Sequence, residues 1–308
     1  MTTTAPETVA TTAAEPARTT PAHGPSARRS TPLTIAMLAA LAYFLLPLFW
    51  LLIASTKSAQ DLFDSFGLWF SHTPRLLTNI KETFTQDNGV FARWLLNTVV
   101  YAVVSAVGAA LLAAAGGYGF AKFRFRGDRI AFNLVLGAVM VPTTALAIPT
   151  YLLFAKAGLV NTPWAVILPS LVNPFGLYLM RIYAADAIPD SLLEAARIDG
   201  AGEAKIFFRI ALRLLAPGLV TVLLFTLVAT WNNYFLPLIM LNDTSLYPIT
   251  VGLSSWAAQA QNGGAGASSD MIALVVTGSL ISIVPLVAAF LLLQRYWQSG
   301  LATGGVKQ

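Results

Sequence analysis

The sequence predicts an all-α membrane protein that crosses a bilayer about six times. Three observations lead to this prediction: the composition is strongly apolar, the apolar residues form long uncharged runs, and basic residues gather between alternate runs. Hydrophobic residues make up 56% of the 308 residues and charged residues only 11%, whereas a soluble domain carries about 25% charged residues. A soluble chain of this size cannot cover so much apolar surface with polar groups, so lipid is expected to surround much of it.

Six apolar runs are long enough to cross the hydrocarbon core as helices, at about 1.5 Å per residue. They comprise residues 33–54, 94–121, 130–155, 164–182, 214–241 and 271–293. Only helices and closed barrels satisfy their backbone groups in lipid, and continuous runs of this length are helices rather than alternating barrel strands. Residues 1–30 are rich in Thr, Ala, Pro and Ser and are predicted to be a disordered tail, so the transmembrane domain is expected at 31–308.

The basic residues are divided unevenly between the two sides that six crossings would define. The side that holds residues 1–30 carries 14 of the 19 Lys and Arg residues, and the other side carries 5. Because cytoplasmic loops hold the excess of Lys and Arg in membrane proteins, we expect both termini in the cytoplasm. This distribution also explains the net charge of +5 without a nucleic-acid partner.

What the sequence lacks narrows the possible functions. There is no cysteine, and the two histidines, His23 and His72, lie in the tail and in a connecting loop, which leaves too little for a metal or His-based catalytic site. The sequence has no G-x-x-x-x-G-K-[ST] loop, so any ATP hydrolysis must come from another subunit. All fourteen acidic residues lie in loops, in the tail or at the ends of runs, whereas ion-coupled transporters usually place acids inside spans. Ion-coupled transport is therefore disfavoured, although coupling through backbone carbonyls stays open.

The longest predicted cytoplasmic loop, at about 186–213, carries the most informative motif. Ser191 and Glu194 have the S-x-x-E spacing of a capping box, which would begin a short helix after Pro189. Gly200 and Gly202 would end that helix, because glycine readily adopts the left-handed conformation found at helix C-termini. On these residues alone, the loop is predicted to be a well-capped surface helix.

The wider stretch is more specific than its caps. Glu194-Ala195-Ala196, followed by Asp199-Gly200, resembles the E-A-A loop motif of the permease subunits of ABC importers. In that family the short helix lies parallel to the membrane and docks in a cleft of the ATPase subunit. The resemblance implies that these residues couple the chain to an ATP-binding cassette ATPase dimer. The alanines would allow close approach of the partner, and Gly200 would allow the turn into the next helix. Glu194 would present a negative charge to the partner.

The resemblance covers nearly all of the chain beyond the tail and indicates the carbohydrate-importer branch. The matching segments are 97–98, 119–127, 231–238 and 294–307, and the last is similar to the ending of the maltose-type second permease subunit. The sequence departs from the family pattern at Arg213, where such permeases usually have a proline. This departure puts the family's local bend in question.

The resemblance implies a whole importer around this chain. It implies six transmembrane helices with an ABC importer (MetI-like) core in the last five, a transport role rather than an enzymatic one, and no cofactor. The implied partners are an ATPase dimer, a second permease subunit, an extracytoplasmic solute-binding protein and the lipid of a bacterial plasma membrane. ATP binding would close the ATPase dimer, move the loop and shift the helices between inward-facing and outward-facing states.

A polar and aromatic cluster in the fifth run is a candidate substrate pathway. Trp231, Asn232, Asn233 and Tyr234 place hydrogen-bonding groups and aromatic faces in an otherwise apolar region. Sugars are recognised by hydrogen bonds to their hydroxyls and by stacking on aromatic rings, so these residue types suit a sugar pathway. Hydrogen bonding between helices is the alternative, since it is common for buried Asn in membrane proteins.

Three other functions stay open at this point. An ion-coupled secondary transporter would not need the E-A-A loop. An ABC importer for a non-sugar solute would share the loop but not the carbohydrate-type ending. A membrane-embedded enzyme is the weakest alternative, because the sequence offers no nucleophile–base or metal constellation.

Overall fold

The computed structural model describes residues 30–262 and 267–304, with side chains described for 30–262 and 270–294. The tail predicted at 1–30 therefore lies, apart from Ser30, outside the described residues. The chain divides into two units between Leu46 and Pro47, within helix α1 (Thr31–Ser55). Pro47 lacks the amide proton that would continue the helical hydrogen bonding, and the α1 residues that precede it in the first unit are all exposed.

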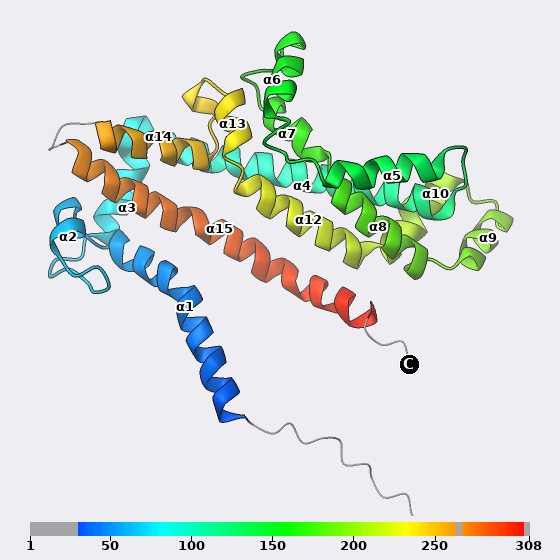
Figure 1. The fold of residues 1–308 in the computed structure, drawn as a ribbon, viewed down its shortest axis with the longest axis horizontal. Helices are drawn as coiled ribbons and strands as arrows, with labels where there is room; N and C mark the ends of the chain where they lie inside the picture. The colour runs from blue at the N-terminus through cyan, green and yellow to red at the C-terminus, as the bar shows by residue number, and fades with distance from the viewer. Residues whose placement is uncertain (1–29, 263–266, 305–308) are drawn as a thin grey trace, which may run out of the picture. The chain divides into compact units, whose positions relative to one another are not determined.

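The second unit contains all the other helices (Figure 1). They are α2 (Ala59–Asp64), α3 (Leu76–Thr85), α4 (Val90–Lys122), α5 (Asp128–Val139), α6 (Ala147–Lys156), α7 (Trp164–Leu171), α8 (Pro174–Ala187), α9 (Asp190–Ile198), α10 (Glu203–Ile206), α11 (Leu212–Leu214), α12 (Ala216–Trp231), α13 (Phe235–Met240), α14 (Ile249–Asn262) and α15 (Ala267–Gly304). Two 3-10 turns, Gln86–Gly89 and Thr244–Leu246, and a π-helical turn, Phe207–Ala211, complete the list.

The core of the second unit is built on α4, which packs against both α8 and α12, while α12 also packs against α15 (Figure 1). One face of α4 consists largely of alanines, among them Ala106, Ala110 and Ala114, all fully buried. Gly117 continues this face, and a β-carbon there would lie 2.6 Å from the backbone of α8 at Met180. The small residues of α4 therefore allow α8 to approach closely.

The six predicted crossings are only partly matched. Among the described residues, four helical segments are long and apolar enough to span a membrane, or five if a bent pair is one span. The run predicted at 130–155 is not one helix, because α5 ends at Val139 and α6 begins at Ala147, with Pro142 between them. A proline cannot donate a helical hydrogen bond, which explains the break. A count of six spanning helices is therefore not confirmed, although the core fits the predicted all-α class.

The bent pair lies where the sequence departs from the family pattern. The segments Glu203–Leu214 and Ala216–Trp231 meet at an angle of 78°. Pro217 stands in the first turn of α12 and cannot bond to the carbonyl of Arg213, four residues earlier. The bend is thus present with Arg213 in place, and Pro217 accounts for it.

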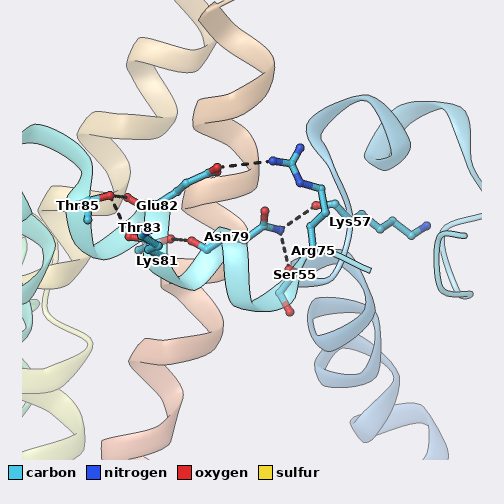
Figure 2. A network of polar contacts seen from close by, with 8 residues as sticks. All are labelled: Ser55, Lys57, Arg75, Asn79, Lys81, Glu82, Thr83 and Thr85. Carbon is cyan, nitrogen blue, oxygen red and sulfur yellow. Dashed lines mark hydrogen bonds and ion pairs between the residues drawn. The ribbon is translucent and has the colours of Figure 1, made fainter. Parts of the chain in front are cut away.

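The C-terminal end of α1 is tied to α3 by a buried polar network, here called the α1–α3 joint (Ser55, Thr56, Lys57, Arg75 and Asn79). The side-chain amide of Asn79, only 2% exposed, donates to the carbonyls of Ser55 and Lys57 at 2.9 Å each (Figure 2). The backbone amide of Arg75 donates to the carbonyl of Thr56 at 2.8 Å. These bonds satisfy carbonyl groups at the end of α1 that have no partner within the helix.

Candidate functional site

The segment between α8 and α10, here called the α9 loop (residues 188–202), is a short helix with a defined end. Gly200 has φ of +79°. Its amide donates to the carbonyl of Arg197, and the amide of Ala201 donates to the carbonyl of Ala196, both at 3.0 Å. This is the Schellman arrangement that glycine favours, so Gly200 ends α9 as predicted. The predicted capping box does not form, because α9 begins at Asp190, one residue before Ser191, and has no side-chain cap.

Helix α9 has one face toward the bundle and one face that is exposed. Leu193 and Ala196, three residues apart, are buried in a cluster that includes Tyr118 of α4 and Met180 of α8. The motif residues Glu194, Ala195, Asp199 and Gly200 are exposed, and so is Ile198 beside them. The motif residues are thus divided: Ala196 packs on the helix bundle itself, whereas Glu194, Ala195, Asp199 and Gly200 are accessible.

Ion pairs hold both ends of α9. At its first residue, Asp190 accepts a hydrogen bond from Lys122 Nζ at 2.7 Å, and Lys122 has a side chain only 7% exposed at the end of α4. At its last turn, Arg197 Nε donates to Glu203 at 2.7 Å. The bond from Lys122 holds the pKa of Asp190 below its usual value, and the bond to Glu203 raises the pKa of Arg197. Asp190 also suits a helix N-terminus, where the macrodipole favours negative charge.

The bundle beneath α9 contains an unusual polar atom. The hydroxyl of Tyr118 is buried and has no hydrogen-bond partner among the described residues. Its ring packs against Phe123 and Phe207, with centroids 5.6 and 5.4 Å away. The contact surface of α9 is therefore aromatic and largely apolar, and the ion pairs lie at its two ends.

A cavity of about 450 Å³ opens among the end of α12, α14 and α15. Its lining brings together Trp231, Asn232 and Tyr234, three of the four residues of the predicted pathway. Asn233 is not part of the lining, and its carbonyl accepts a hydrogen bond from Thr250 Oγ1 at 2.7 Å. Asn232 Nδ2 donates to the carbonyl of Val228 at 2.9 Å, so part of its amide serves the helix end.

The rest of the lining of this cavity is rich in hydroxyls. Ser254 Oγ lies 3.1 Å from the hydroxyl of Tyr234, and Thr250, Ser279 and Ser282 also line the space. Hydroxyl and phenol groups can both donate and accept hydrogen bonds. An indole, an amide and several hydroxyls therefore converge on one space, a donor and acceptor set suited to an uncharged polyhydroxy solute.

Comparison with protein families identifies the chain. Residues 106–301 match the family described as "Binding-protein-dependent transport system inner membrane component". The chain belongs to this family. This permease is thus a multi-pass membrane component of a binding-protein-dependent transport system, consistent with its four or five candidate spans within the described residues.

Curated relatives and a solved structure agree with this assignment. The arabinooligosaccharides transport system permease protein of Bacillus subtilis is 33% identical over 265 residues, covering 86% of this permease and 91% of that protein. The lactose transport system permease protein of Rhizobium radiobacter is 30% identical over 264 residues, covering 85% and 90%. A chain from the crystal structure of a bacterial ABC transporter involved in the import of the acidic polysaccharide alginate matches with a TM-score of 0.75 and 24% identity. The match covers 89% of this permease and all of that chain, and at this identity it shows the shared fold.

Some residues of the α9 loop and of the cavity at the end of α12 were not predicted from the sequence. Ile198 is 86% exposed although it is apolar, and its position within the loop motif was the available signal. Lys122 lies 68 residues from Asp190, so no local pattern joins them. Ser279 and Ser282 share a face of α15 at a spacing of three residues, but the sequence does not show that this face meets α12.

Proposed function

We propose that this permease is one of two transmembrane subunits of a bacterial ABC importer for a sugar or oligosaccharide. Two ATP-binding cassette subunits would bind at the cytoplasmic face, and an extracytoplasmic solute-binding protein would deliver the sugar. The carbohydrate transport named for the curated relatives supports the substrate class, and membership of a binding-protein-dependent family supports the delivery step.

The observation that carries the proposal is the exposed face of α9. Glu194 and Asp199 offer negative charge, Ala195 and Gly200 allow close approach, and Ile198 offers an apolar side chain that a partner can cover. A helix ended by a Schellman turn and held at both ends by ion pairs keeps these groups in one arrangement. Such a surface fits docking to the cleft of an ATPase subunit.

The same geometry supports a route by which docking reaches the core. Ala196 and Leu193 pack on the cluster that contains Tyr118 of α4, and Lys122 ties the start of α9 to the end of α4. Because α4 packs against α8 and α12, movement of α9 would be passed to the helices that form the core. ATP binding would then shift the population between inward-facing and outward-facing states, and the permease itself would perform no chemistry.

The cavity lined by Trp231, Asn232 and Tyr234 is the proposed sugar contact. Its volume of about 450 Å³ lies within the roughly 300–1,000 Å³ of small-molecule sites. An indole face and neighbouring hydroxyls match the apolar faces and hydroxyl groups of a sugar ring. The excess of basic residues supports an orientation with both termini and the α9 loop in the cytoplasm.

Purification of the tagged permease from its native membrane in mild detergent tests the proposal. We expect a second permease chain and a nucleotide-binding chain with a P-loop to co-purify. The reconstituted complex should take up labelled sugar only when ATP is present on its cytoplasmic side and binding protein is present on the opposite side of the vesicle membrane. A permease that purifies alone and transports in vesicles without ATP would contradict the proposal and indicate ion coupling.

A further inference from the structure

Large aromatic side chains are concentrated in the segment that follows α1. Phe63, Phe66, Trp69 and Phe70 are between 47% and 73% exposed, although they lie in a connection and not in a spanning helix. Exposed aromatic rings in a loop are costly in water, because each ring carries a large apolar area. The proposed sugar contact and the α9 loop make no use of this cluster.

The segment does not project away from α1 but returns alongside it. The position that a β-carbon of Gly67 would occupy is 3.6 Å from the indole nitrogen of Trp50. Trp50 precedes the end of α1 at Ser55 by five residues, which corresponds to about 7.5 Å along a helix axis. The aromatic segment is therefore held beside the last turns of a candidate spanning helix.

Buried polar contacts fix this return. Lys57, whose side chain is almost fully buried, donates from Nζ to Ser65 Oγ and to the carbonyl of Phe66, each at 2.8 Å. Ser71 Oγ donates to Asp61 Oδ2 at 2.7 Å, across the other side of the segment. A buried ammonium group is unfavourable unless its hydrogen bonds are made, so these contacts hold the segment in one conformation with its rings outward.

We propose that Trp50, Phe63, Phe66, Trp69 and Phe70 form an interfacial aromatic anchor whose partner is phospholipid at the boundary between headgroups and acyl chains. Three observations favour lipid. The anchor is continuous with the exposed apolar residues of α1 in the same unit, Leu48, Phe49 and Leu52. It lies beside the last turns of a candidate span, and it is aromatic. Aromatic rings concentrate at that depth in membrane proteins. In the orientation proposed above, with both termini in the cytoplasm, the rings lie in the outer leaflet. The depth of the rings does not depend on that orientation.

The absence of cysteine from the sequence makes a direct test possible. A nitroxide label would be placed by Trp69→Cys in the full complex, reconstituted in vesicles of phosphatidylethanolamine and phosphatidylglycerol. Collision with oxygen reports lipid exposure, and collision with a water-soluble nickel chelate reports aqueous exposure. The exposed Gln261 of α14, replaced as Gln261→Cys, is the aqueous reference.

We expect the oxygen-to-nickel collision ratio at position 69 to exceed that at position 261 several-fold. Nickel accessibility equal to that at position 261 would place the rings in water and overturn the proposal. Protection from both reagents would show that protein covers the rings and would overturn it equally. Phe63→Cys provides the same measurement if the Trp69 variant does not fold, and the depth result is independent of whether the substrate is a sugar.

Discussion

The α1–α3 joint and the α9 loop both connect elements of the bundle through polar groups, but they do so in opposite environments. In the joint, Asn79 and Lys57 are almost fully buried and bond mainly to backbone carbonyls. In the loop, Asp190 and Arg197 are exposed, and their charged side chains bond to those of Lys122 and Glu203 outside it. A buried carbonyl without a donor costs much more than an exposed ion pair contributes. The joint is thus expected to stay fixed while the α9 loop is free to respond to a partner.

The largest expected effect on stability is at the joint. Asn79→Leu leaves the carbonyls of Ser55 and Lys57 without their side-chain donor, which should destabilise the permease by about 2–4 kcal/mol. Thermal unfolding in lipid nanodiscs measures this. Thr85→Ala is the control, because Thr85 is exposed and bonds only to nearby carbonyls of its own helix. Equal unfolding midpoints for the two variants would show that the joint is not the rigid region.

The next effect is on the end of α9. Gly200→Val places a β-carbon at φ of +79°, a conformation that costs about 1–2 kcal/mol for such residues. Amide hydrogen exchange in α9 should accelerate, by about tenfold for each 1.4 kcal/mol. Gly202→Ala is the matched control, since Gly202 has φ of −71° and open space around it. Equal acceleration in both variants would argue against the Schellman turn as the element that holds the loop.

A smaller effect on stability, but a clear effect on coupling, is expected at the start of α9. Lys122→Met keeps the buried methylene stem and removes the pair with Asp190. Sugar uptake per ATP hydrolysed should fall several-fold while the unfolding midpoint changes little. The charge exchange Lys122→Glu with Asp190→Lys should restore part of the ratio. Arg124→Gln, which removes a fully accessible neighbouring charge, is the control, and an equal loss there would show a general charge effect.

The smallest effect is the pH dependence of the α9 loop. Because the pKa of Asp190 is lowered in the folded protein by the bond from Lys122, the pair stabilises the loop above the unfolded pKa of about 3.9. This contribution is lost only as the pH falls through the lower, folded pKa. Hydrogen exchange at the start of α9 should therefore be insensitive to this group between about pH 5 and 8. A loosening step below about pH 4 should be absent in Asp190→Asn.

The same two regions show what the sequence could predict. Gly200 marks the end of α9 because a left-handed residue is a local requirement, and the E-A-A stretch located the loop. The helix begins directly after Pro189 as expected, but its N-cap is Pro189 itself and not Ser191, two residues later, which fitted a capping pattern. The first helical residue, Asp190, instead bonds to Lys122, 68 residues away. No local pattern indicated that Asn79 bonds to carbonyls more than twenty residues away, or that Ala196 packs inward while Ala195 is exposed.

The break in the predicted third span has a similar explanation. Composition alone marks 130–155 as one apolar run, and only the fold separates α5 from α6. The cavity likewise depends on tertiary contact: Trp231, Asn232 and Tyr234 were found as a local cluster. Ser254, Ser279 and Ser282 reach the same space from α14 and α15.

Transport by the double variant Glu194→Lys with Gly200→Asp tests the central claim, that the exposed face of α9 couples this permease to an ATPase. Both residues are exposed, and a β-carbon at Gly200 meets no atom of this chain within 4 Å. Asp is also among the non-glycine residues that best tolerate the left-handed conformation found there, at φ of +79°, so the variant should reach the membrane at the wild-type level. We expect sugar uptake to fall to background and the ATPase to be lost from the purified complex while the second permease subunit is retained. Uptake close to that of the wild type, at equal membrane levels, would contradict the account.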